Sequence, residues 1–392
     1  EGATAGVFIN LSKQLEGFTM TGGAYDDMLQ GSVVADSISA GAGDDTIVDF
    51  VGADTVDGGA GFNTITLSAT SLTLNSARDA QIVNVEAVSA AGAVASVIIN
   101  LSIQTEGFTI TGGSGNDTIY GGAGDDLIIA GTGGDIINGF VGTDTVLGGL
   151  GVDAIVLTAT SATLNAAGDG QISDIEAVSA STTTLGVAIN LARQTEGFSI
   201  TGGAGADTIS GGSGADSIIG GLGADKVLGG AGADIIYGFV GADTVDGGLG
   251  SDVLKLEATS QALNAAVDAQ LVGLEAISVE GATAGVFINL SKQLEGFAVT
   301  GGAYGDTLQG GLSADSISAG DGDDVIVDFA GADAVDGGVG VDTMTLSATS
   351  LMLNGAKDAQ IVNVEAVSAA GAVAGVMINL SNQLDGFTLT GS

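Results

Sequence analysis

A nine-residue repeat, nested inside a longer repeat, restricts the folds that this chain can adopt. Four blocks carry it, and they are numbered here in chain order: residues 22–66, 112–156, 202–255 and 301–345. Position eight of every nonapeptide is apolar, and position six is aspartate in all but one. Nine residues is not a helical period, but it suits a tight turn followed by a three-residue strand. We therefore predict an all-β fold, a right-handed parallel β-solenoid.

Glycine and proline usage supports this prediction. The 392 residues include 69 glycines and no proline. Glycine supplies the turn conformations with positive φ that other residues avoid. A chain without proline keeps every backbone N–H available for the ladders between successive coils.

The segments between the blocks, called spacers here, hold less glycine and alternate apolar with polar residues. They cover residues 1–21, 67–111, 157–201, 256–300 and 346–392. We expect them to form wider β-helical coils, so that blocks and spacers make one continuous solenoid. Separate small β-domains are the alternative.

The composition removes several classes of function. Without histidine or cysteine, the chain can build no Ser-His-Asp triad, no Cys-His pair and no ordinary zinc site. Its 47 acidic residues against seven basic ones give a net charge of −40. Such a chain would be repelled by nucleic acid, and no apolar run is long enough to insert into a membrane. We therefore expect no enzyme activity, no nucleic-acid partner and no membrane insertion.

The position-six aspartates constrain the fold further. With two nonapeptides in each coil, aspartates of alternate units would stack along one edge about 4.8 Å apart. Like charges at that spacing repel by several kcal/mol, so cations must lie between them. Carboxylate and carbonyl oxygens suit calcium better than magnesium, and counting one ion between stacked units gives roughly a dozen.

The predicted calcium ligands are the aspartates at position six. They are Asp27, Asp36, Asp45, Asp54, Asp117, Asp126, Asp135, Asp144, Asp153, Asp207, Asp216, Asp225, Asp234, Asp243, Asp252, Asp306, Asp315, Asp324, Asp333 and Asp342. In the first block Asn63 takes the place of the last aspartate, and we expect it to weaken that site. The units at 31–39 and 49–57 lack turn glycines, so calcium is less certain there.

The nonapeptides resemble a known family. "GGSGNDTIY" at 112–120 and "GGAGADTIS" at 202–210 are similar to the repeats of RTX proteins, the hemolysin-type calcium-binding repeats. The resemblance implies a parallel β-roll, calcium held by the position-six aspartate and turn carbonyls, type I secretion, and folding outside the cell. An extracellular or bacterial cell-surface location follows from it. The spacers resemble those of large bacterial surface proteins, including adhesins and S-layer proteins.

These features favour a structural role. The preferred hypothesis is a calcium-stabilised rod, fibre or lattice element at a bacterial surface or in its matrix. Its partners would be further copies, end to end or laterally, or cell-surface polysaccharide. The alternative is the calcium-binding region of a type I-secreted enzyme whose catalytic domain lies outside this chain.

A glutamate recurs in each of the four spacers that follow a block, in the sequence "EAV" or "EAI". The four are Glu86, Glu176, Glu275 and Glu365. A catalytic carboxylate pair is needed only once, whereas these residues appear in each copy. We therefore interpret them as residues of the coil corners.

Overall fold

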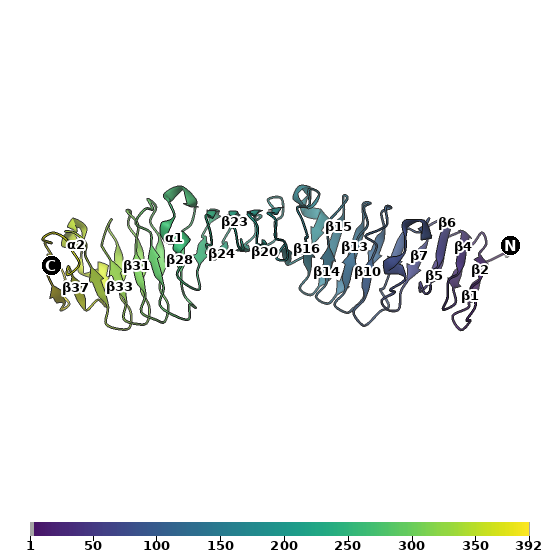
Figure 1. Ribbon diagram of the computed structural model, residues 1–392, viewed down its shortest axis with the longest axis horizontal. Helices are drawn as coiled ribbons and strands as arrows, with labels where there is room; N and C mark the ends of the chain where they lie inside the picture. The colour runs from purple at the N-terminus through teal and green to yellow at the C-terminus, as the bar shows by residue number, and fades with distance from the viewer. Residues whose placement is uncertain (1–3, 392) are drawn as a thin grey trace. The chain divides into compact units, whose positions relative to one another are not determined.

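The computed structural model describes residues 4–391 of a chain that divides into two compact units, residues 1–180 and 181–392. Each unit, taken by itself, is a stack of short parallel strands joined by turns, as Figure 1 shows. The predicted all-β parallel β-solenoid is confirmed. The strands are short because each nonapeptide offers only one inward-facing apolar side chain, at position eight.

The register between strands shows how many nonapeptides make one coil. Ile119 pairs with Ile137, and Ile128 pairs with Val146, each 18 residues further along the chain. One coil of a block is therefore two nonapeptides. Aspartates two units apart consequently lie on the same edge, one above the other, as the sequence pattern predicts.

Unit 1 contains three sets of parallel strands. Their bounds are β1 (Phe8–Asn10), β3 (Met28–Gln30), β5 (Thr46–Val48), β7 (Thr64–Thr66), β9 (Ala87–Ser89), β11 (Thr109–Thr111), β13 (Leu127–Thr132), β15 (Thr145–Leu150) and β17 (Ile172–Ser173) in the first set; β2 (Thr19–Thr21), β4 (Ser37–Ala42), β6 (Thr55–Ala60) and β8 (Ile82–Val83) in the second; and β10 (Ile98–Asn100), β12 (Thr118–Tyr120), β14 (Ile136–Asn138), β16 (Ala154–Val156) and β18 (Ala177–Ser179) in the third.

Unit 2 is built in the same way. Its sets are β19 (Ala188–Asn190), β21 (Thr208–Ser210), β23 (Lys226–Gly232), β25 (Thr244–Gly250) and β27 (Leu271–Val272); β20 (Ser199–Thr201), β22 (Ser217–Ile219), β24 (Ile235–Tyr237), β26 (Val253–Lys255), β28 (Ala276–Ser278), β30 (Ala298–Thr300), β32 (Ser316–Ser318), β34 (Ala334–Asp336) and β36 (Ile361–Val362); and β29 (Phe287–Asn289), β31 (Thr307–Gln309), β33 (Val325–Val327), β35 (Thr343–Thr345), β37 (Ala366–Ser368) and β38 (Thr388–Thr390).

The spacers form wider coils. In unit 1, Ile65 pairs with Val88, and Val88 pairs with Ile110, so the strands of spacer 67–111 stack directly on those of the blocks. These steps of 23 and 22 residues exceed the 18 of a block coil, and short helical turns take up part of the extra length. They are η1 (Leu74–Ser76), η2 (Asp79–Gln81), η3 (Leu164–Ala166), η4 (Asp169–Gln171), α1 (Gln261–Ala265), η5 (Asp268–Gln270), α2 (Leu351–Gly355) and η6 (Asp358–Gln360).

The core of each unit is a column of apolar side chains from the strand centres. Ile47, Ile65 and Ile137 are completely buried, as is nearly every position-eight residue. Each such side chain contributes about 1.5–3 kcal/mol on burial. Phe50 and Phe140 close the core where a block meets its spacer, with 1% and 2% of their surfaces exposed. This core holds the turns, and thus the aspartates, at fixed positions.

Candidate metal sites

The turns place every position-six aspartate inside the solenoid edge, where water has little access. All twenty predicted ligands are buried, with between 0% and 6% of their surface exposed. One carboxylate oxygen of each reaches back to the preceding coil. The amide N–H of Asp117 donates to Oδ1 of Asp135 at 2.6 Å, and that of Asp135 donates to Oδ1 of Asp153 at 2.7 Å. The aspartates of one edge thus form a hydrogen-bonded column, called here an Asp column.

The second carboxylate oxygen, Oδ2, has a backbone donor in some aspartates and none in others. In the first units of each block, the N–H at position two of the same turn donates to it. Gly113 donates to Asp117 at 2.5 Å, and Gly122 donates to Asp126 at 2.7 Å. These carboxylates are satisfied by the protein alone.

A further group of aspartates has no donor for this oxygen. Within residues 4–391, eight position-six aspartates keep a buried Oδ2 without any hydrogen-bond partner, and they are called open aspartates here. They are Asp45, Asp135, Asp153, Asp225, Asp234, Asp252, Asp324 and Asp342. A buried carboxylate oxygen without a partner costs several kcal/mol, so something must satisfy it.

The backbone at position two explains the difference. In the turns of the open aspartates, the position-two glycine has positive φ, for example 115° at Gly131 and 102° at Gly149. Here the turn continues the strand ladder, and Gly131 pairs with Gly149. The N–H of Thr132 donates to the carbonyl of Gly113 at 3.2 Å. Turn N–H groups that join the ladder are no longer available to the carboxylate.

The oxygen atoms around the open aspartates are suitable ligands for calcium. Opposite Asp234 Oδ2, the carbonyl oxygen of Gly247 projects from the next coil, and a Cβ on Gly229 would overlap both oxygens. Asp234 Oδ2 has no hydrogen-bond donor, and a cation would satisfy it. No three acidic side chains gather at one point within residues 4–391, so turn carbonyls would supply the other ligands. Such oxygen-rich, irregular coordination is what calcium accepts, and a bound ion would neutralise the stacked carboxylates.

The electrostatics of the Asp columns also favour a bound cation. Burial raises the pKa of Asp135, Asp225 and Asp324 to about 6, and the charges of their neighbours in the column add to the effect. For Asp135 these neighbours are Asp153 and Asp117. The pKa is raised because the charged form has lost its water and faces like charges.

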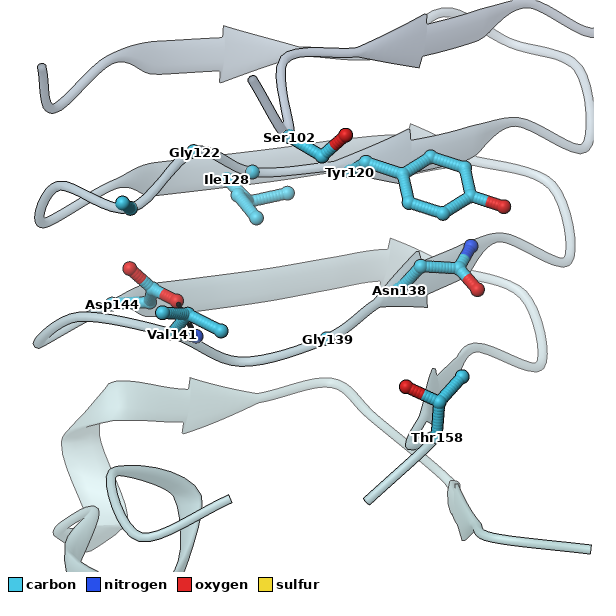
Figure 2. Close-up of a pocket in the computed structure, with 11 residues that line it drawn as sticks. Ser102, Tyr120, Gly122, Ile128, Asn138, Gly139, Val141, Asp144 and Thr158 are labelled. Carbon is cyan, nitrogen blue, oxygen red and sulfur yellow. Dashed lines mark hydrogen bonds between the residues drawn. The ribbon is translucent and has the colours of Figure 1, made fainter. Parts of the chain in front are cut away.

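Turns with a residue other than glycine at position two also satisfy the Oδ2 of their aspartates. The N–H of Ser32 donates to Asp36 Oδ2 at 2.5 Å, and the N–H of Val141 donates to Asp144 Oδ2 at 3.0 Å. Asp144 borders a groove of about 330 Å³ that Tyr120 and Asn138 also line, as Figure 2 shows. Both carboxylate oxygens of Asp144 accept backbone N–H groups, so Asp144 presents no open oxygen to this groove.

Four glutamates that the sequence interpretation assigned to coil corners also belong to the columns. Oε2 of Glu176 accepts the N–H of Asp153 at 2.7 Å, and Oε2 of Glu86 accepts the N–H of Asn63 at 2.6 Å. Glu275 and Glu365 do the same for Asp252 and Asp342. Each glutamate lies 23 residues after the last position six of its block. This constant separation was the signal that could have identified them.

Replacing Gly229 by alanine is expected to disrupt one open site. The new Cβ would collide with Asp234 Oδ2 and the carbonyl of Gly247, and the backbone oxygen has little room to move. We expect a loss of about 1–3 kcal/mol in unfolding free energy in calcium, measured by guanidinium denaturation. Gly170→Ala is the control, since a Cβ there meets nothing within 4 Å. Equal midpoints for the two variants would contradict the geometry.

The comparisons with known proteins identify the repeats. A family model described as the RTX calcium-binding nonapeptide repeat matches residues 34–65, 109–137, 124–155, 199–227, 219–254, 300–327 and 310–344. No curated protein matches the sequence. None of the helices within residues 4–391 is long and apolar enough to cross a membrane. The matches lie almost wholly inside the four blocks, where the buried aspartates stack. The four blocks of this chain are therefore RTX calcium-binding nonapeptide repeats.

Proposed function

We propose that this chain is a calcium-stabilised structural element that works outside the cell, as part of a rod, fibre or lattice at a bacterial surface or in its matrix. The observation that carries the proposal is the set of eight buried aspartate oxygens that no protein donor satisfies. RTX nonapeptide repeats bind calcium and typically belong to secreted proteins. Calcium is abundant outside cells and scarce inside them, so folding would be coupled to export.

The surface supports a structural rather than a catalytic role. Three of the best-formed recesses are copies of one another, each beside the phenylalanine that closes a block: Phe50, Phe140 and Phe239. An enzyme concentrates its chemistry in one distinctive pocket, whereas these recesses follow the repeat. Association with further copies, end to end or laterally, or with surface polysaccharide, belongs to the same proposal.

Electron microscopy of the purified chain tests this function. In millimolar calcium we expect extended particles of uniform width, or ordered assemblies of them, and in chelator we expect these to disappear. Sedimentation velocity on the same samples would show whether copies associate. Particles of the same form with and without calcium would overturn the proposal.

A further inference from the structure

We propose that the spacers complete a metal site at the end of blocks 2, 3 and 4. In each, the last open aspartate, a spacer glutamate and a spacer carbonyl would hold one ion. This inference rests on the proposed calcium binding and adds three sites in which two of the three named ligands come from the spacer. In block 2 the groups are the carboxylates of Asp153 and Glu176 and the carbonyl of Asp174.

The glutamate occupies the place of a position-six aspartate. Glu176 Oε2 accepts the N–H of Asp153 at 2.7 Å, as Asp153 Oδ1 accepts that of Asp135 in the coil before. The N–H of Glu176 donates in return to the carbonyl of Asp153 at 3.1 Å. Glu176 is exposed, while Asp153 is completely buried and its Oδ2 has no partner. The column therefore ends in a carboxylate that an ion can reach from solvent.

The carbonyl is aimed by an unusual backbone conformation. Asp174 has φ of 54°, which a residue other than glycine rarely adopts. A Cβ built on Gly148 would lie 2.7 Å from Asp153 Oδ2 and closer still to the carbonyl oxygen of Asp174. Both acceptor oxygens thus lie against the Cα of Gly148, and Asp153 Oδ2 has no hydrogen-bond donor. A cation beside this glycine would satisfy both.

The ends of blocks 3 and 4 repeat this arrangement. Asp252 and Asp342 each have an unpartnered Oδ2 and are completely buried. The corresponding carbonyls belong to residues with φ of 58° and 52°. These residues and the glutamates that follow them are Gly273 with Glu275, and Asn363 with Glu365.

Block 1 is a natural control, because there asparagine replaces the last aspartate. Asn63 Oδ1 accepts the N–H of Asp45 at 3.1 Å, so the column continues. Its Nδ2 donates at 3.1 Å to the carbonyl of Asn84, which has φ of 52° and stands where Asp174 stands in block 2. An amide N–H thus fills the space between the two groups. We infer that block 1 closes with a hydrogen bond where the other three blocks close with an ion.

Variants that exchange aspartate and asparagine at the ends of the blocks test the inference. The triple variant Asp153→Asn, Asp252→Asn, Asp342→Asn should bind three fewer calcium ions than the wild type, one for each block. Because each new amide can donate to the spacer carbonyl, we expect the variant to keep its β-sheet signal in calcium. The reciprocal variant Asn63→Asp should bind one additional ion. Native mass spectrometry and equilibrium dialysis measure both numbers, and Asp385→Asn, at an exposed aspartate, is the matched control.

The glutamate has its own test. Replacing Glu176, Glu275 and Glu365 by glutamine preserves an oxygen for the N–H of the preceding aspartate but removes the charge. We expect calcium affinity at three sites to fall at least tenfold, visible as a weaker phase in a calorimetric titration. The other sites should keep their affinity.

The outcomes separate the two proposals. A wild-type chain that binds no calcium would overturn the proposed function and this inference together. A wild type that binds calcium, with unchanged numbers of ions in the triple aspartate variant and in Asn63→Asp, would overturn only the inference. If the triple variant fails to fold, the gain or lack of gain in Asn63→Asp decides.

Discussion

Chelation of calcium near neutral pH is expected to abolish most of the β-sheet circular dichroism of this chain. The position-six aspartates are buried in columns, and eight of them keep an oxygen that the protein does not satisfy. A ligand at a hundred times its dissociation constant contributes about 2.7 kcal/mol per site. Eight such sites would contribute on the order of 20 kcal/mol, more than the whole stability of a typical domain. Removing the ions leaves buried like charges, and the fold should not survive that.

The controls separate specific binding from screening. Magnesium at the same concentration should restore little structure, because its strict octahedral geometry and firmly held water suit these turns poorly. Added sodium chloride should also restore little, since buried charges are only weakly screened. Re-addition of calcium should recover the signal. A spectrum that stays the same in EDTA would refute the calcium-dependent fold.

The fold of the four blocks could be predicted from the sequence. Position-eight residues such as Ile119 and Ile137 recur in step, and their pairing 18 residues apart follows from two nonapeptides per coil. Stacked aspartates follow from the same count. The prediction succeeded because every nonapeptide has the same pattern of turn and strand residues. The geometry of a coil therefore depends on the repeat period rather than on distant contacts.

The division into open and satisfied aspartates could not be read in this way. Gly113 and Gly149 both occupy position two of a "GGxGxD" turn. Gly113 donates its N–H to Asp117, whereas Gly149 has φ of 102° and pairs with Gly131 in the neighbouring coil. Glycine accepts either conformation, so the neighbouring coil decides. Counting stacked units predicts roughly a dozen ions, and that number stays a prediction. The structure shows eight open aspartates.

The glutamates at the block ends were missed for a related reason. A spacer coil is longer than a block coil, so Glu176 falls outside the nine-residue pattern, although it follows Asp153 in the column. A local sequence motif does not show which residue of a spacer coil stacks on a given position of the block coil before it. Only the same separation in all four copies carries that information.

Without calcium, acidification should stabilise the fold, the reverse of ordinary acid denaturation. Burial raises the pKa of Asp54, Asp135 and Asp234 to about 6, whereas an unfolded aspartate titrates near 3.9. The folded state therefore binds protons more tightly than the unfolded state. The cost of charging these carboxylates is fully present above pH 6 and vanishes below about pH 4. In EDTA, the β-sheet signal lost near pH 8 should return in part near pH 5.

With calcium the dependence should have the opposite sign, because the ion binds the deprotonated carboxylates and competes with protons. The β-sheet signals in calcium and in EDTA are therefore expected to converge as the pH falls from 8 to 5. Asp135→Asn supplies a direct check, since it removes one buried charge from the column. In EDTA its β-sheet signal should return at a higher pH than that of the wild type, because one carboxylate fewer has to be protonated. A chelated wild type whose β-sheet signal does not return between pH 8 and pH 5 would contradict the prediction, since carboxylates that are costly to ionise must produce a gain in stability on acidification.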